Sequence, residues 1–373
     1  MRKKIAIIGA NMPLLHFFKK TKKLGYEIHC FAWDKDAVCK YYADFFYPIS
    51  YTEKEKILDK CRKIRIDGIT SFTLESALPT VNYVSNKLNL NGNSLECEKY
   101  TKNKYTMRQR LADQNIRVPE YQLIKTKKEL FEKNWEYPLI VKPIDNGGSR
   151  GVTKVTNIKE LVSAYQRAKL FSKLNKIIVE QYIEGREFSV EYISHKGNHY
   201  FLSITDKITT GEPYFVELEH HQPSLISEKQ KKKIKNITEN TLNALKVLSS
   251  ASHTELKMDK KGDIYIIEIG LRMGGDRIGS DLVYLSTGYD FIKGVLKLAI
   301  GEFSVPKLKW NKSSGIYFLT KESDHVEPYI NNSEKYAEII IAEKNSNIKN
   351  KTKESSDRAG FFIYKAKRRF TID

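Results

Sequence analysis

The sequence predicts a fold of mixed α/β and α+β class: a parallel α/β domain, a larger α+β part of two subdomains, and a small β-rich C-terminal part. Three observations lead to this prediction. Strand and helix signals alternate over roughly the first ninety residues. Two strand-rich stretches with glycine-rich turns follow, at about 137–215 and 251–270. From about residue 302 onward, short strands are expected again, at 314–320 and 337–342.

The N-terminal region alternates between apolar strand patterns and amphipathic helix patterns. Strands separated by helical crossovers imply a parallel sheet. Gly9 follows the first strand, but residues 9–13 lack the second and third glycines of a dinucleotide-binding fingerprint, so no nicotinamide site is expected. The expected strands are 5–8, 26–31 and 68–72, and the expected helices are 13–24, 53–62 and 77–88.

The chain is strongly basic, with 64 Lys and Arg against 45 Asp and Glu and a net charge of +19. Most of this charge is lysine and is spread along the whole chain. The densest run, residues 229–235, follows a capping-box pattern at Ser227 and Gln230, and apolar residues recur behind it at helical spacing. We therefore predict the solvated face of an amphipathic helix here, which argues against a nucleic-acid partner.

Cysteine usage and hydropathy bear on the compartment. The four cysteines, Cys30, Cys39, Cys61 and Cys97, show no C-x-x-C spacing, which favours free thiols in a reducing environment. No apolar run reaches the roughly 18 residues of a membrane helix. The start of the chain is expected to be a buried strand and not a secretion signal. These features predict a cytoplasmic protein without a membrane partner.

A lysine and a glycine-rich loop form the first candidate binding element. Residues 138–142 form a short buried strand that ends in Lys142, and the loop 145–151 follows. Glycines allow backbone N–H groups to converge on an anion, and a lysine on the adjoining strand supplies positive charge. These features favour phosphate binding; the alternative is a glycine-rich hairpin with an incidental lysine.

The second candidate element is a hinge between two strands. A strand at 176–181 is followed by a turn at Gly185 and an alternating strand. Such a hinge offers backbone groups to the edge of an adenine, and Glu187 can accept hydrogen bonds from ribose hydroxyls. The alternative is that Glu180 and Glu187 are ordinary exposed carboxylates.

The third element is a β-hairpin, residues 253–270, with a two-residue turn at Lys261 and Gly262. That turn predicts that Met258 faces Tyr265, that Leu256 faces Ile267, and that these four residues share an apolar face with Ile269. Glu255 would then face Glu268 on the other side of the hairpin, with Cβ atoms roughly 5 Å apart. Two like charges so placed call for a cation, and Mg²⁺ is the natural choice. The alternative is two glutamates that are solvated or neutralised by Lys257.

Arg272 follows the hairpin and is suited to holding a carboxylate or phosphate in a bidentate manner. Gly274 and Gly275 beside it allow a substrate to approach closely.

Taken in order, these elements resemble the ATP-grasp superfamily, and within it the carboxylate–amine ligase branch. The resemblance implies a pre-ATP-grasp domain at 1–98, an ATP-grasp domain at 99–300 and a C-terminal subdomain at 301–373. Within the central domain, about 118–190 would clamp the nucleotide, and about 191–300 would hold metal and substrate.

The resemblance also implies a role for each site residue. Lys104 and Lys142 would bind the phosphates, together with a loop that comprises Asn146, Gly147, Gly148, Ser149 and Gly151. The adenine would lie at a hinge made of Glu180, Gln181 and Ile183, and Glu187 would bind the ribose. Glu255 and Glu268 would be the magnesium ligands. Arg272 would bind the substrate or acyl phosphate, with Lys142 as its catalytic partner. Glu217 and His220 would face the acceptor substrates, unless this is a surface loop with incidental histidines. Gly274 and Gly275 would border the substrate.

The sequence departs from the family pattern at Gly270, where an Asn ligand is usual. The implied cofactors are ATP and Mg²⁺, with Mn²⁺ as a substitute, and the implied substrates are a small carboxylate and an amine, such as amino acids. A homodimer is the expected oligomer. Two alternatives stay open: a regulatory or nucleic-acid-binding module without turnover, and a carboxylase that uses bicarbonate.

Overall fold

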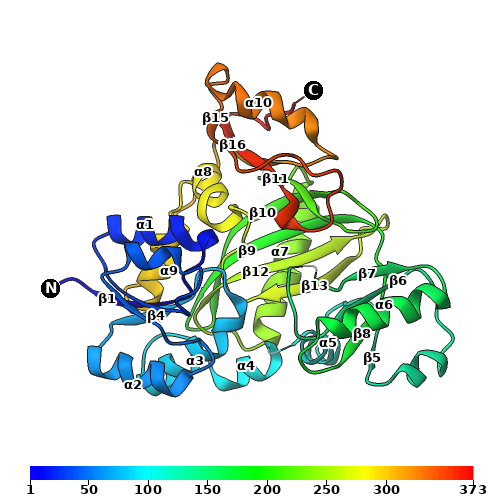
Figure 1. Cartoon of the computed structure of the whole chain (residues 1–373), viewed down its shortest axis with the longest axis horizontal. Helices are drawn as coiled ribbons and strands as arrows, with labels where there is room; N and C mark the ends of the chain where they lie inside the picture. The colour runs from blue at the N-terminus through cyan, green and yellow to red at the C-terminus, as the bar shows by residue number, and fades with distance from the viewer. Residues whose placement is uncertain (102, 149, 373) are drawn as a thin grey trace.

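A computed structural model describes residues 1–101, 103–148 and 150–372. It contains three sheets, which Figure 1 shows as an N-terminal unit in blue, a small green unit around α6, and a long twisted sheet that runs up to the C-terminal strands in red. The mixed α/β and α+β prediction is confirmed.

The N-terminal sheet has the strand order β3-β2-β1-β4, and every pair in it is parallel, as predicted. The short strand β3 was not predicted. Helix α9 comes from a distant part of the chain but packs against α1 and β4, so its apolar side chains belong to the N-terminal core. The elements are β1 (Lys4–Ile8), α1 (Leu15–Lys23), β2 (Glu27–Phe31), β3 (Phe45–Tyr47), α2 (Lys54–Ile64), β4 (Gly68–Thr70), α3 (Leu78–Lys87), α4 (Leu95–Thr101) and α9 (Phe291–Ala299).

The second sheet is antiparallel, in the order β5-β8-β6-β7. Helix α6 packs on this sheet, and its apolar residues form a core of their own with the strands. Helix α5 precedes the sheet and reaches toward the large sheet. The elements are α5 (Lys104–Asp113), β5 (Tyr121–Ile124), β6 (Leu139–Pro143), β7 (Thr153–Val155), α6 (Ile158–Leu170) and β8 (Ile177–Gln181).

The large sheet has eight strands in the order β13-β12-β9-β10-β11-β14-β16-β15. The strands expected near the C-terminus do not form a sheet of their own, because β14 pairs with β11 and continues the sheet that contains the hairpin. The elements are β9 (Arg186–His195), β10 (Asn198–Thr209), β11 (Glu217–Gln222), α7 (Glu228–Ala244), β12 (Ser250–Met258), β13 (Ile264–Gly270), α8 (Val283–Thr287), β14 (Ser313–Leu319), α10 (Glu327–Asn331), β15 (Ile339–Lys344) and β16 (Gly360–Ala366).

Two smaller predictions are confirmed. Helix α7 begins with the expected Ser227–Gln230 capping box, and it buries Ile234 and Leu242. The four cysteines are free and buried. Among the described residues, none of the helices combines the length and hydropathy that crossing a bilayer requires.

The register of the hairpin was predicted only in part. Glu255 does pair with Glu268, but Leu256 pairs with Ile266 and Met258 with Ile264. The predicted two-residue turn is wrong: the Asp259 N–H donates to the Asp263 carbonyl at 3.0 Å, so the turn has three residues, 260–262, and the pairing beside it is shifted by one position. A β-bulge after Glu255 places one extra residue in β13 and so restores the pairing of Glu255 with Glu268. As a result Ile264 and Ile266 occupy the apolar core in place of Tyr265 and Ile267, which is a correction to the predicted face.

Gly185 lies at the hinge between β8 and β9. A Cβ atom at this position would meet the carbonyl oxygen of Met258 at 2.1 Å and its carbonyl carbon at 2.7 Å. These are backbone atoms at the end of β12, so they cannot move aside as a flexible side chain would. The hinge and the hairpin can therefore approach this closely only with glycine at position 185.

We expect Gly185→Ala to lower the free energy of unfolding by about 2 kcal/mol or more, because the new methyl group must push two strands apart. Urea denaturation monitored by circular dichroism measures the change. The adjacent Glu184→Ala is the control, since its side chain is 72% exposed and forms only a surface ion pair with Lys260; its effect should stay within about 0.5 kcal/mol. Equal effects of the two substitutions would contradict the proposed clash.

Candidate active site

A cavity of about 350 Å³ lies where the three parts of the chain meet. Glu75 reaches it from the N-terminal domain, Lys142 from the second sheet, and Lys207 from the large sheet. Most predicted site residues line it: Lys104, Lys142, Asn146, Gly147, Gly148, Glu180, Gln181, Ile183, Glu187, Glu217, His220, Glu255, Glu268, Arg272 and Gly275. The structure thus brings the separate sequence motifs into one site.

Two predicted residues that the structure describes, Gly151 and Gly274, do not line the cavity. Gly151 has φ +77° and faces Phe171, where a Cβ would lie 3.0 Å from that ring. Gly274 lies behind the wall, and its N–H donates to Glu191 at 3.0 Å. Ser149 lies outside the described residues.

Lys104 begins α5, where Asn103 caps the helix by accepting from the Thr106 N–H at 3.0 Å. The Lys104 ammonium group donates to Glu268 at 2.7 Å and to the carbonyl oxygen of Asn146 at 2.8 Å. Burial alone would lower the pKa of Lys104, but the carboxylates of Glu268 and Glu75 outweigh it, so the pKa is raised. The lysine is therefore a fixed positive charge between the glycine loop and the hairpin.

Glu180 is buried and accepts from two cations. Arg108 Nε donates to it at 2.8 Å, and the ammonium group of Lys142 lies 2.6 Å away. The interpretation of Glu180 as an ordinary exposed carboxylate is therefore wrong, since it is only 3% exposed. Burial lowers the pKa of Lys142; Glu180 opposes this shift, and the positive charges of Arg108 and Lys104 add to it.

Arg108 was not assigned a role from the sequence. It lies one helical turn after Lys104 on α5, so the spacing of four residues was a usable signal that both side chains share a face.

The glycine loop leaves space above it. A Cβ at Gly147 or Gly148 would meet nothing within 4 Å, and Gly148 has φ +67°. The Asn146 side chain holds the loop at its base by accepting from the Gly147 N–H at 2.9 Å and donating to the Phe171 carbonyl at 3.0 Å. This arrangement suits an anion above the loop.

Glu255 and Glu268 lie on one side of the hairpin and both line the cavity. Each carboxylate is paired with a lysine from elsewhere in the chain: Glu255 with Lys207 at 2.9 Å, and Glu268 with Lys104 at 2.7 Å. The lysine that the alternative interpretation invoked, Lys257, lies instead 3.9 Å from Glu187.

The two glutamates fit a Mg²⁺ site of the kind that uses one or two carboxylates together with substrate phosphates. The described residues contain no group of three or more His, Cys, Asp or Glu side chains that could hold a metal alone. At Gly270, where the family usually has Asn, a Cβ would lie 3.2 Å from Arg272 Nε, so the arginine takes the space of that side chain. If the two glutamates bind Mg²⁺, its other oxygen ligands would come from nucleotide and water.

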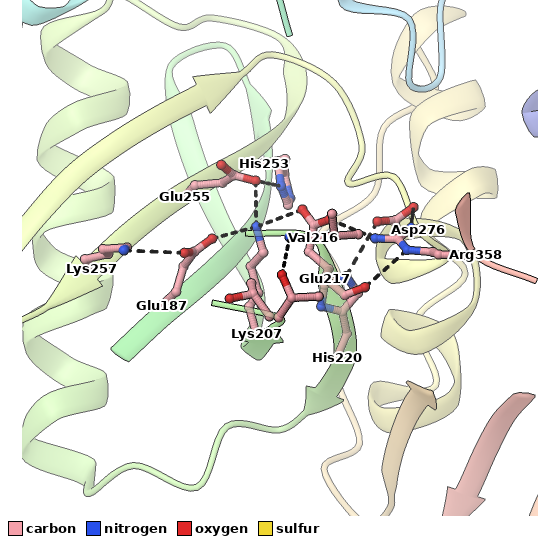
Figure 2. Close-up of polar contacts among 12 residues, drawn as sticks. Glu187, Lys207, Val216, Glu217, His220, His253, Glu255, Lys257, Asp276 and Arg358 are labelled. Atoms are coloured by element: carbon pink, nitrogen blue, oxygen red, sulfur yellow. Dashed lines mark hydrogen bonds and ion pairs between the residues drawn. The ribbon is translucent and has the colours of Figure 1, made fainter. Parts of the chain in front are cut away.

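Lys207 is the main functional residue that sequence reasoning missed. Its ammonium group is 2.9 Å from Glu187, 2.9 Å from Glu255 and 3.7 Å from Glu217, and Figure 2 shows it at the centre of these carboxylates. Although burial works against the charged form, the three glutamates raise the pKa of Lys207 well above its usual range. A lysine inside an apolar strand pattern was the only sequence signal.

A second buried pair supports Glu255 from behind. His253 forms an ion pair with Glu191, which is fully buried, and its other ring nitrogen lies 3.4 Å from Glu255. Burial opposes protonation, but Glu191 and Glu255 outweigh it and raise the pKa of His253 to about 9. Neither His253 nor Glu191 was singled out from the sequence.

The residues predicted to face an acceptor lie on β11. His220 and His221 are each 1% exposed, so the alternative of a surface loop with incidental histidines is wrong. Burial lowers the pKa of His220, although Asp276 at 3.7 Å partly opposes this. Nearby, Arg272 donates to the Met273 carbonyl at 2.9 Å, and its Nε has no hydrogen-bond partner among the described residues.

Comparison with known proteins agrees with this geometry. The sequence profile of the ATP-grasp domain matches residues 135–280. The fold matches the L-amino acid ligase from Bacillus licheniformis with a TM-score of 0.80 and 25% identity, over 98% of this chain and 94% of that one. Residues 135–280 therefore form an ATP-grasp domain. Its relatives are of the carboxylate–amine ligase branch, as predicted.

Other similar proteins match with lower coverage or a lower TM-score. The D-alanine–D-alanine ligase of Thermosipho melanesiensis is 28% identical over 227 residues, which is 56% of this chain. The chain spans only about 60% of the length of that relative. A biotin carboxylase from Campylobacter jejuni shares the ATP-grasp fold, with a TM-score of 0.72 and 21% identity, over 99% of this chain and 88% of that one.

We expect Glu180→Gln to destabilise the protein by about 3 kcal/mol at neutral pH, because it leaves Arg108 and Lys142 buried without their counter-charge. Burial would raise the pKa of Glu180, but the two cations outweigh it and lower the pKa below 4.5. This stabilisation is thus fully present above pH 4.5 and is lost as the pH falls through the lowered pKa.

Urea denaturation of both proteins between pH 7 and pH 3 measures the difference in stability, which should shrink at the acid end. Glu228→Gln is the matched control, because its side chain is 87% exposed on α7. A stability difference between wild type and Glu180→Gln that does not change with pH would contradict the assigned ion pairs.

Proposed function

We propose that the protein is an ATP-dependent carboxylate–amine ligase that forms an amide bond through an acyl phosphate. One observation carries this proposal. A pair of facing carboxylates, Glu255 and Glu268, shares a cavity with three buried lysines, a glycine loop and Arg272. Phosphoryl transfer requires charge neutralisation and positioning more than a protein nucleophile, and this cavity supplies both.

The nucleotide would lie between the two antiparallel sheets. Gln181 and Ile183 at the hinge, with Ile140 and Ile267 on facing strands, provide an edge and apolar walls for a purine ring. Glu187 would accept hydrogen bonds from the ribose hydroxyls. The N–H groups of Gly147 and Gly148 and the ammonium groups of Lys104 and Lys142 would bind the phosphate oxygens.

Glu255 and Glu268 would hold Mg²⁺, or Mn²⁺ in its place, and the bound ion would neutralise charge on the phosphoryl oxygens. The two lysines now paired with these glutamates, Lys207 and Lys104, would then become available to the phosphates.

The reaction has two steps. In the first, an oxygen of the substrate carboxylate bonds to the γ-phosphorus, and the bond from that phosphorus to ADP breaks. In the second, the amine nitrogen attacks the acyl carbon, the carbon–oxygen bond to phosphate breaks, and the nitrogen loses a proton. Arg272 would stabilise the acyl phosphate, and the glycine loop would exclude water.

The proposal is tested by measuring ADP release with ATP, Mg²⁺, each common L-amino acid or small carboxylate as the acid, and a panel of amines. Hydroxylamine in a parallel set of reactions traps any acyl phosphate as a hydroxamate. We expect ADP release to depend on both acid and amine. ADP release that is indifferent to every acid would refute the ligase, and turnover only with bicarbonate would identify a carboxylase.

Glu255→Gln and Glu268→Gln should each lower the rate by about 100-fold or more, because each removes a charge that holds the cation. EDTA should abolish activity, and Mg²⁺ or Mn²⁺ should restore it. Glu228→Gln serves as the control, since it removes a carboxylate from the exposed face of α7. Undiminished activity of both glutamate variants would exclude the assigned metal site.

A further inference from the structure

The C-terminal part of the chain reaches the cavity through the loop 345–359, which connects β15 to β16. Glu354 and Ser355 of this loop line the cavity. The loop has a fixed shape, because Asp357 accepts from the N–H groups of Lys353 at 2.8 Å and Glu354 at 3.1 Å. It lies outside the stretch 135–280 that matches the ATP-grasp domain.

Arg358 at the end of this loop lies behind the cavity wall. Its side chain is 8% exposed, and its guanidinium lies 3.9 Å from the centre of the Phe318 ring. The fork donates to the Glu217 carbonyl at 3.1 Å and to the Glu217 carboxylate at 2.7 Å, and it lies 3.0 Å from Asp276. All three nitrogens are therefore used, in a geometry that lysine cannot reproduce.

These contacts extend a chain of alternating charges, which can be followed in Figure 2. It runs from Lys257 to Glu187, then to Lys207, to Glu217 and to Arg358. Glu217 is the shared member, because one of its oxygens faces Lys207 and the other accepts from Arg358. The carboxylate of Glu217, which lies beside Lys207, is thus oriented by Arg358 of the C-terminal loop.

Arg358 also holds a strained segment. Asp276 and Arg277 have φ values of +48° and +65°, which lie in the left-handed region that non-glycine residues seldom adopt. The Asp276 carboxylate is fixed between Arg358 and His220. Loss of the arginine would remove the main contact that keeps this carboxylate at the cavity wall.

We propose that Arg358 is a positioning residue for the acceptor half of the site, which it builds by holding Glu217 and Asp276 in place. This rests on the proposed ligase function. Both carboxylates line the cavity while the guanidinium stands behind them, so these three charges sum to −1. Lys207 lies 3.7 Å from Glu217 but is shared with two closer carboxylates, Glu187 and Glu255, so it does not cancel the negative charge of this wall. Such a wall attracts a primary amine that arrives protonated, such as the amino group of an amino acid.

The test separates activation of the acid from capture of the amine. Hydroxylamine is small and uncharged at neutral pH. Hydroxamate formation therefore needs ATP and the acid but does not need the negatively charged wall that would bind a protonated amine. For Arg358→Gln we expect hydroxamate formation and the KM for ATP to stay within about threefold of wild type. The KM for the L-amino acid that serves best as acceptor should rise by about tenfold or more. Asp276→Asn should likewise raise the KM for this amino acid while hydroxamate formation and the KM for ATP stay within about threefold of wild type.

Arg369→Gln is the matched control. Arg369 is also a C-terminal arginine paired with a buried aspartate, Asp206, but neither residue lines the cavity. This variant should lower the melting temperature without raising the KM for the amino acid. If Arg358→Gln does not fold, Arg358→Lys keeps the charge without the fork and should show a smaller rise of the same KM.

Three results would overturn the inference. Equal losses of hydroxamate formation and ligation would mean that Arg358 supports the whole site. An unchanged KM for the amino acid would mean that it is a passive contact, and an equal rise in Arg369→Gln would mean that any C-terminal weakening has this effect. A wild-type protein that forms no hydroxamate with any acid refutes the ligase function itself, which is a separate outcome.

Discussion

The site depends on the neutralisation of half-buried carboxylates by cations that come from distant parts of the chain. Glu255 and Glu268 are neighbours across β12 and β13, and two like charges on paired strands repel each other. Lys207 from β10 and Lys104 from α5 offset this repulsion. Because Lys104 lies on α5 and Glu268 on β13, this ion pair also fixes how α5 and the large sheet meet.

The same principle explains the other buried charges. Glu180 is held by Arg108 and Lys142, and Glu191 is held by His253. Removing one member of such a pair lowers the free energy of unfolding by more than the intact pair adds to it, because the partner's charge remains buried and uncompensated. These pairs are therefore stronger constraints on geometry than on net stability, and they keep the polar groups of the cavity in fixed positions without substrate.

Much of this arrangement could be predicted from the sequence, because the signals are local. The alternation of strands and helices predicted the parallel sheet. The predicted pairing of Glu255 with Glu268 is confirmed, although the two-residue turn from which it was derived is wrong, because the bulge offsets the longer turn. The bulge after Glu255 could not be predicted, since no glycine or proline marks it, and the longer turn reversed the faces of Tyr265 and Ile267. Lys207 and Arg358 were missed for a different reason: their partners lie 10 to 141 residues away, so only the folded chain shows them together. The domain boundaries and the roles of individual site residues stay predictions.

The continuity of the large sheet has a consequence for how the chain can be divided. Strand β11 lies beside β10 on one side and β14 on the other, so the last seventy or so residues cover an edge that would otherwise offer free backbone N–H and C=O groups. A fragment ending near residue 300 would expose that edge to strand addition by another molecule, a route to aggregation. The segment that matches the ATP-grasp domain, residues 135–280, is thus shorter than a fragment would have to be to keep this edge of the sheet covered.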